Sequence, residues 1–318
     1  MMEERILAFH VGMFERTLGI SCVENHYASF LLYKNLPLEY VFYKSYEELP
    51  VTVRRLYTQR KNYANYDAIE RIQSVGERIG LARSTFLRHV PTEQLRERME
   101  SSLANDRPLL MRIKPDGLPS LFGLTPLRDD HFVMVHGYDQ EQVYLLEDYP
   151  QRALKLPWDQ LDHIYAGDTI TFEELDKFEA DAYMALVMEE LAQWRHAAED
   201  EKLPSILEQA ASMPEDLVYI RDAVGIHRIV TRRMLAWVNG LQSNARIFAD
   251  IVPSQIEETA EMTNRLYGLL EACRLRKRAD ARKLHHAIDD IARSGRQWVK
   301  AIQDALEENN TLLRRSLV

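Results

Sequence analysis

Cysteine is scarce in this chain of 318 residues, which contains only Cys22 and Cys273. Two cysteines so far apart in sequence make neither a disulfide framework, a CxxC pair nor a zinc ribbon. Such sparse use of cysteine is typical of proteins in a reducing compartment. We therefore expect a cytoplasmic protein whose cysteines act, if at all, as single thiols.

Positive charge and long apolar runs are also lacking. The formal net charge of −9 argues against a general nucleic-acid binder, which needs a basic surface. The first residues, MMEERILAFHVGMFERTLG, carry acids where a signal peptide carries basic residues. No window approaches 18 apolar residues, so we expect no membrane-spanning helix and no membrane partner. No internal repeat or low-complexity linker is present either.

What is present divides the chain into two halves. Residues 1–190 mix helical and strand patterns, whereas residues 191–318 are almost purely helical. The sequence therefore predicts an α+β domain over 1–190 and an all-helical bundle domain over 191–318. The helical half also offers a surface for a homodimer, although nothing in the sequence requires one.

The stretch SCVENHYASFLLYKN has apolar residues at helical spacing, with Ser21 as a plausible N-cap. This pattern places Cys22 in the first turn, near the positive end of the helix dipole. The dipole and the free amides there favour a thiolate, which is the nucleophilic form of cysteine. The other interpretation is that Cys22 is a small buried core residue, as free cysteines often are.

Three apolar runs predict strands, and the last two are close enough to form an antiparallel hairpin. They are PLLMRI (108–113), HFVMVHGYD (131–139) and QVYLLEDYP (142–150). A fourth run, YMALVME (183–189), fits a strand or the start of the helical half equally well.

A nucleophilic thiol needs a base, and the base needs an orienting group. His131 opens one predicted hairpin strand, and Asp148 ends the other, where it can face His131. His136 points to the opposite face by strand alternation and is a weaker candidate. His26, one helical turn after Cys22, competes as the base or is simply a half-exposed helix histidine.

Glu24 and Asn25 lie beside Cys22 in the same predicted turn. The negative charge of Glu24 complements the helix dipole, and this effect alone would explain the residue. Alternatively, these two residues hold the amine of a substrate.

Outside this region the sequence offers weaker signals. Cys273 lies in a helical pattern and fits core packing. His285 and His286 are sequential, which is poor geometry for a shared metal ion, so we expect no metal site. The segment RLRKRADARK (274–283) has six basic residues, and is either a solvated surface or a docking patch for an acidic partner.

The order of a helix-borne Cys, a strand His and a strand Asp resembles that of papain-like cysteine enzymes. HFVMVHGYDQEQVYLLEDYP is similar to the His and Asp strands of the double-glycine leader peptidases. The whole series DRPLLMRI, DGLPSLFG, HFVMVHGYD, LEDYP and LKLPWDQL more closely resembles the N-terminal domain of the butirosin biosynthesis protein H family. The resemblance covers roughly residues 10–165.

This resemblance implies an acyltransferase of specialised, antibiotic-type metabolism. Cys22 would be the nucleophile, His131 the general base and acid, and Asp148 the orienting group. The acyl or aminoacyl group would arrive as a thioester on an acyl or peptidyl carrier protein and leave as an amide on a small-molecule amine. The phosphopantetheine arm would belong to that carrier, so the protein itself would need no cofactor.

The sequence departs from the papain-like pattern in two places. No Gln precedes Cys22, so the amide of Cys22, with Arg16 or Thr17, would have to supply the oxyanion donors. Tyr149 also separates Asp148 from the following proline, which leaves Glu147 and Asp139 as alternative orienting groups.

Two other functions stay open. A cysteine hydrolase of the same fold, either a peptidase or a thioesterase, would use the same three residues. A non-catalytic binding or assembly protein would keep the fold and give Cys22 the reactivity of an ordinary thiol.

Overall fold

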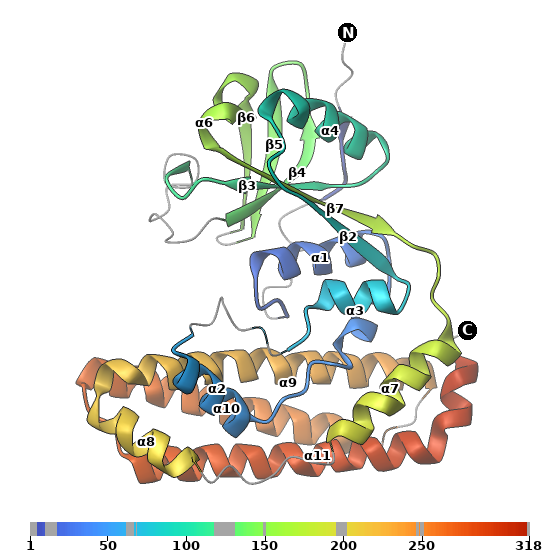
Figure 1. The fold of residues 1–318 in the computed structure, drawn as a ribbon. Helices are drawn as coiled ribbons and strands as arrows, with labels where there is room; N and C mark the ends of the chain where they lie inside the picture. Colours follow the sequence, from blue (N-terminus) through green and yellow to red (C-terminus); the bar gives the residue numbers. More distant parts are fainter. Residues whose placement is uncertain are drawn as a thin grey trace. The chain divides into compact units, whose positions relative to one another are not determined.

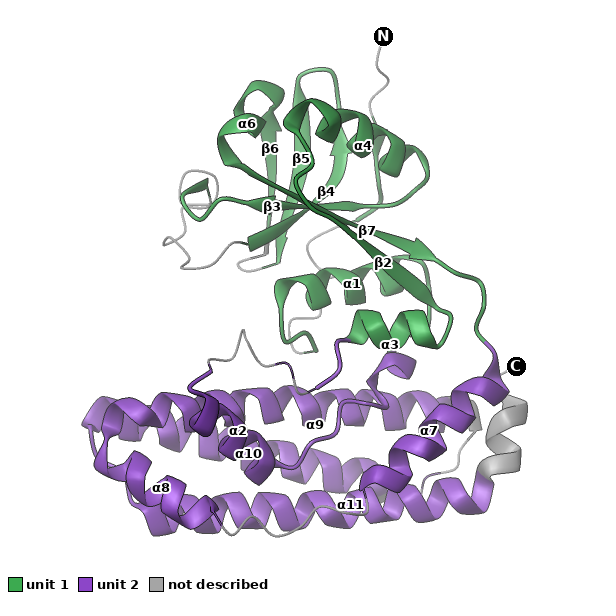
Figure 2. Cartoon of the chain, in the orientation of Figure 1, with its two compact units in different colours: residues 1–38, 72–178 green, residues 39–71, 179–318 purple. Residues whose placement is uncertain are grey.

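The computed structural model divides into two compact units, shown in Figures 1 and 2. One unit, here called the α+β unit, comprises residues 1–38 and 72–178, and the other, the helical unit, comprises 39–71 and 179–318. The described residues are 5–9, 18–61, 67, 69–117, 131–148, 151–194, 202–245, 248 and 251–316. The predicted α+β class, with a helix that begins at Cys22, an antiparallel sheet and a C-terminal helical region, is confirmed.

The α+β unit is built on a seven-stranded sheet in which every pairing is antiparallel. Its strands are β1 (Arg5–Ile6), β2 (Ala82–Leu87), β3 (Leu109–Ile113), β4 (His131–Tyr138), β5 (Gln142–Asp148), β6 (Gln151–Pro157) and β7 (Tyr165–Glu174). The strand order is β2-β7-β3-β4-β5-β6, and β1 also pairs with β4. The three predicted strands correspond to β3, β4 and β5, whereas the sequence analysis does not predict β1, β2, β6 and β7.

In the part of this unit that the structure describes, the helical segments are α1 (Cys22–Tyr33), α3 (Ile72–Arg78), α4 (Thr92–Ala104), η4 (Trp158–Gln160) and α6 (Leu161–Ile164). Helix α1 packs against β4, β5 and α3. Its inward face is aromatic: the rings of Tyr27 and Phe30 contact Phe172 of β7, with centroids 5.3 and 5.5 Å away. Each such buried ring stabilises the fold by roughly 1.5–3 kcal/mol. This packing fixes the helix, and so the position of its first residue, on the sheet.

The predicted hairpin of β4 and β5 is confirmed, and its register changes along its length. Near the turn, Tyr138 pairs with Val143 and Gly137 with Tyr144. Beyond an irregularity between Val135 and Gly137, Val135 pairs with Leu145. A bulge of this kind inserts one extra residue on one strand and shifts all later pairs by one position. It therefore decides which β5 side chains share a face with His131.

The helical unit contains the rest of the chain. Its helices are η2 (Leu38–Phe42, whose first residue belongs to the α+β unit), α2 (Leu49–Gln59), α7 (Ala180–Trp194), α8 (Leu203–Ser212), η5 (Pro214–Asp216), α9 (Leu217–Ala245), α10 (Ile251–Arg276) and α11 (Ala281–Ser316). The ambiguous run 183–189 is therefore helical. Trp237 and Trp298 are fully buried in the core. Their indole N–H groups donate to Tyr183 Oη at 2.8 Å and Thr259 Oγ1 at 3.2 Å.

The division between the units differs from the sequence-based one at 190. The structure divides at 178, and residues 39–71 pack with the helices rather than with the sheet. Within the helical unit, α2 packs on α9, and Tyr57 Oη donates to Asp216 Oδ2 at 3.0 Å. Among the helices that the structure describes, none has a long enough apolar stretch to cross a membrane.

Candidate active site

Cys22 is the first residue of α1, as the N-cap pattern predicted. Ser21 has extended backbone angles, and its Oγ accepts from the backbone N–H of Glu24 at 3.3 Å. The Glu24 carboxylate is buried and accepts from the N–H groups of Ile20 at 2.7 Å and Ile72 at 3.1 Å. These contacts hold the residues that lead into the helix, while Cys22 stays partly exposed.

Gly19 is another of the residues that lead into α1. A Cβ atom at position 19 would overlap the side chain of Asn25. Only glycine leaves room for the chain to pass so close to α1. The position of Asn25 therefore depends on the absence of a side chain at Gly19.

His131, the first residue of β4, meets Cys22 from the sheet. The ring Nε2 lies 2.9 and 3.0 Å from the two carboxylate oxygens of Glu147, and Cys22 is near enough to the ring to act on its pKa. Burial lowers the pKa of His131, but the hydrogen bonds and charges of Cys22 and Glu147 outweigh it and raise the pKa to about 11. The geometry therefore favours an imidazolium beside the thiol.

Asp148, the predicted orienting group, is not hydrogen bonded to His131. Its Oδ1 lies 3.7 Å from His131 Nε2, beyond hydrogen-bonding distance. Its Oδ2 instead accepts from Asn25 Nδ2 at 2.6 Å. The alternative candidate, Glu147, makes the hydrogen bond to His131 in the structure. Asp139, the other alternative, binds Tyr144 Oη and turn amides at the far end of the hairpin.

Glu147 and Asp148 form a buried pair of adjacent acids. Burial raises the pKa of Glu147, and Asp148 adds to this against the opposing effect of His131, giving a pKa of about 6. Burial also acts to raise the pKa of Asp148, but His26, Glu147, Asn25 and His131 together lower it. Glu147 is therefore the first of the two to take up a proton as the pH falls.

The structure places the remaining candidates near Cys22 in supporting positions. His26 is fully buried, burial lowers its pKa, and its Nε2 lies 3.1 Å from the carbonyl oxygen of Phe132. Glu24 and Asn25 were candidates for binding a substrate amine. The Glu24 carboxylate contacts backbone amides, and the Asn25 amide contacts Asp148. Arg16 and Thr17 lie outside the described residues.

Three residues of this site could also hold a metal ion. Ligand atoms of His131, Glu147 and Asp148 all lie within 4.8 Å of one another. A histidine with two carboxylates is a donor set that zinc accepts. The sequence analysis expects no metal site, whereas the donor atoms of these three residues are placed so that they could hold a metal ion.

The weaker sequence candidates all lie in the helical unit. Cys273 is partly exposed on α10, not buried as its pattern suggested. His285 Nε2 lies 3.3 Å from Asp289, and His286 Nε2 lies 3.4 Å from Asp290, each one turn along α11. The basic segment 274–283 spans the end of α10 and the start of α11.

Comparison with known proteins adds no assignment. No protein-family model matches the chain, and no curated protein matches it significantly. Function must therefore be inferred from the residues and the geometry of the site.

Proposed function

We propose that the α+β unit is a papain-like cysteine acyltransferase. It would take an acyl or aminoacyl group from a carrier-protein thioester and transfer it through Cys22 to a small-molecule amine. The observation that carries the proposal is that Cys22, the first residue of a helix, acts on His131 and raises the pKa of its ring, while Glu147 holds the ring's Nε2. A thiol at a helix N-terminus beside an imidazolium is the arrangement that produces a thiolate nucleophile.

In the first half-reaction the Cys22 sulfur attacks the carbonyl carbon of the thioester. The new carbon–sulfur bond gives a tetrahedral intermediate, which collapses as the bond to the pantetheine sulfur breaks. His131 gives its proton to that leaving thiolate. The products are an acylated Cys22 and a free pantetheine thiol on the carrier.

In the second half-reaction the acceptor amine attacks the same carbonyl carbon, now attached to Cys22. His131, neutral after the first step, takes a proton from the amine nitrogen. The carbon–sulfur bond breaks, which releases the amide and restores the pair of thiolate and imidazolium. The sum of both steps is thioester plus amine to amide plus thiol.

Glu147 serves as the orienting group for His131 in this proposal. Its two oxygens contact Nε2, which leaves Nδ1 as the ring nitrogen for the proton transfers. Asp148 would act through Asn25 and the shared charge of the acid pair rather than by direct contact. The developing oxyanion would be stabilised by the amide of Cys22, because the first amides of a helix have no partner within the helix.

Two rival functions use the same site differently. A peptidase or thioesterase would release the acyl group from Cys22 to water instead of an amine. A binding or assembly protein would form no acyl intermediate. The resemblance to the butirosin biosynthesis protein H family favours transfer to an amine, in a pathway of specialised metabolism.

The test is to mix the protein with a panel of acyl and aminoacyl pantetheine thioesters and measure its intact mass. We expect an adduct in the wild type and in Cys273→Ala, and none in Cys22→Ala. Decay of the adduct with and without a panel of amines then distinguishes transfer from hydrolysis. Equal adduct in Cys22→Ala and wild type, or none at all in the wild type, would overturn the proposal.

A further inference from the structure

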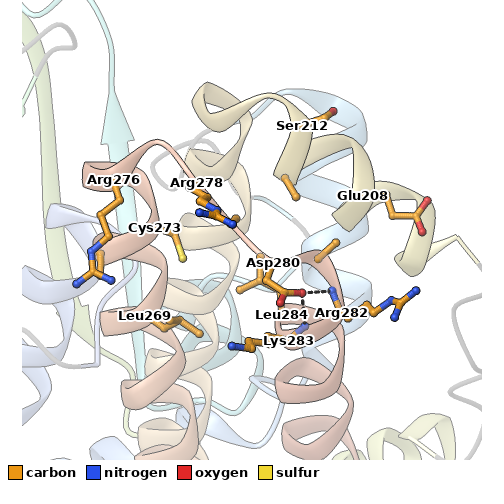
Figure 3. Close-up of a pocket in the computed structure, with 14 residues that line it drawn as sticks. Glu208, Ser212, Leu269, Cys273, Arg276, Arg278, Asp280, Arg282, Lys283 and Leu284 are labelled. Atoms are coloured by element: carbon orange, nitrogen blue, oxygen red, sulfur yellow. Dashed lines mark hydrogen bonds between the residues drawn. The ribbon is translucent and has the colours of Figure 1, made fainter.

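The helical unit contains a cavity that the proposed function does not use. Its volume is about 880 Å³, and it lies among the end of α10, the start of α11 and the neighbouring α8 (Figure 3). The basic segment 274–283 provides much of its lining. A cavity of this size lies within the range that small organic ligands occupy.

Positive charge predominates around the cavity. The charged lining residues are Arg276, Arg278, Arg282 and Lys283, with Glu208 and Asp280 as the acids. Asp280 caps α11, because its Oδ1 accepts from the N–H groups of Arg282 at 3.0 Å and Lys283 at 3.2 Å. Figure 3 shows that Arg278 and Lys283 point towards the space beside Cys273, whereas Arg276 and Arg282 extend outwards.

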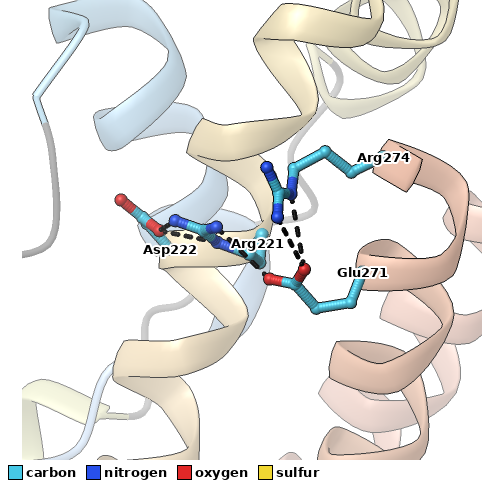
Figure 4. Close-up of polar contacts among 4 residues, drawn as sticks. All are labelled: Arg221, Asp222, Glu271 and Arg274. Atoms are coloured by element: carbon cyan, nitrogen blue, oxygen red, sulfur yellow. Dashed lines mark hydrogen bonds and ion pairs between the residues drawn. The ribbon is translucent and has the colours of Figure 1, made fainter. Parts of the chain in front are cut away.

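These four cations make no ion pair with any residue that the structure describes. Their neighbour Arg274 behaves differently: its guanidinium lies 3.1 Å from Glu271, which in turn binds Arg221 of α9 at 3.2 Å (Figure 4). The positive charge of Arg274 is thus balanced by an ordinary ion pair with Glu271. The cations of the cavity form no such pair among the described residues, and they outnumber the two acids of the lining, Glu208 and Asp280.

Helix electrostatics explains only part of this arrangement. Arg276 is in the last turn of α10, where the negative end of the dipole favours a cation. Arg282 and Lys283 are in the first turn of α11, where the positive end of the dipole disfavours one. Arg278 adds a third positive charge beside that helix end. A bound anion would relieve this accumulation of like charge.

We infer that this cavity binds a phosphorylated small molecule. Its phosphate groups would lie between Arg278 and Lys283, since guanidinium and ammonium groups are the usual phosphate ligands. Its organic part would lie on the apolar side of the cavity, which Leu269 and Leu284 form. A cavity whose volume matches a small organic molecule suits that ligand better than the surface of an acidic protein. This inference is independent of the proposed chemistry at Cys22.

The first test is calorimetric titration of the full chain with pyrophosphate at about 0.1 M salt. We expect one saturable site in the wild type and binding weakened about tenfold or more in the double variant Arg278→Gln with Lys283→Gln. The matched control, Arg265→Gln with Arg293→Gln, removes the same charge elsewhere in the helical unit and should bind normally. An equal loss in both double variants, or no saturable binding in the wild type, would overturn the inference.

A second test uses Cys273 as a reporter within the cavity. Iodoacetate is an anion and iodoacetamide is neutral, so their relative rates at Cys273 report the local potential. We expect the ratio of the iodoacetate rate to the iodoacetamide rate to fall in the Arg278→Gln, Lys283→Gln variant, and pyrophosphate to protect Cys273 in the wild type. An unchanged ratio, or an absence of protection, would contradict a phosphate site here.

Discussion

His131 Nε2 lies 2.9 and 3.0 Å from the carboxylate oxygens of Glu147, which is itself fully buried. A buried carboxylate that holds one ring nitrogen fixes both the tautomer and the orientation of the imidazole. The other nitrogen is then available to Cys22, which raises the pKa of the ring. Glu147, rather than Asp148, is therefore the residue whose loss should most affect the base.

The first prediction compares these two acids. We expect Glu147→Gln to slow acylation of Cys22 on the order of 100-fold, because it removes the charge that holds His131 protonated and oriented. Asp148→Asn should have a smaller effect, since Asp148 contacts Asn25 directly and His131 only through its charge. The measurement is the rate of adduct formation by intact mass. A larger loss in Asp148→Asn than in Glu147→Gln would restore Asp148 as the orienting group.

The contact of His131 with Glu147 instead of Asp148 has a structural cause that the sequence did not reveal. Continued without interruption, the register near the hairpin turn would pair Val133 with Asp148 and put Asp148 on the face of His131. The bulge between Val135 and Gly137 shifts the pairs by one, so that Glu147 takes this face instead. Gly137 is the one hint of a bulge in HFVMVHGYD, because a glycine inside a strand often accompanies one, but the apolar pattern fits either register.

Other features were predictable to different degrees. The Ser21 cap and the spacing of Tyr27 and Phe30 were enough to predict a helix from Cys22. In contrast, the place of residues 39–71 in the helical unit depends on distant partners, such as the bond between Tyr57 and Asp216. Sequence periodicity describes local structure and contains no information on such pairs.

The second prediction concerns stability and pH. A raised pKa means that the native state binds the His131 proton more tightly than the unfolded chain does. The resulting stabilisation is complete below about pH 6.5 and is lost as the pH rises towards the folded pKa of about 11. The difference in unfolding free energy between the wild type and His131→Gln should therefore shrink from about pH 9 to about 10.5, by at most about 1.4 kcal/mol per pH unit, because the thiol of the unfolded chain is already ionised there and adds no opposing proton exchange. Urea titrations measure it, and a difference that grows with pH would contradict the assignment.

The third prediction separates thiol chemistry from metal chemistry. If His131 and Glu147 serve the thiol, dialysis against a chelator should leave the rate of Cys22 acylation unchanged. Added Zn²⁺ should slow it, because the metal would bind the imidazole and the thiolate. Loss of acylation on chelation, with recovery on adding Zn²⁺, would instead assign the three-residue cluster to a metal.

The fourth prediction tests how closely the backbone at Gly19 passes the side chain of Asn25. Gly19→Ala should destabilise the α+β unit by about 1–3 kcal/mol, because the new Cβ overlaps the side chain of Asn25. Gly268→Ala is the matched control: its Cβ meets nothing within 4 Å on α10, so it should stabilise the helical unit by about 0.4–1 kcal/mol. Chemical unfolding measures both changes. Stabilisation by Gly19→Ala would show that the chain before Cys22 does not pass so close to Asn25.

The central claim is that Cys22 and His131 act as an ion pair. The most direct measurement is the rate of iodoacetamide modification of Cys22 as a function of pH, in the wild type and in His131→Ala. The account predicts that wild-type Cys22 reacts at pH 7 nearly as fast as at pH 9, and that the variant loses this reactivity at pH 7. A wild-type rate that rises only near pH 8.5, as for an ordinary thiol, and that the mutation leaves unchanged would contradict it.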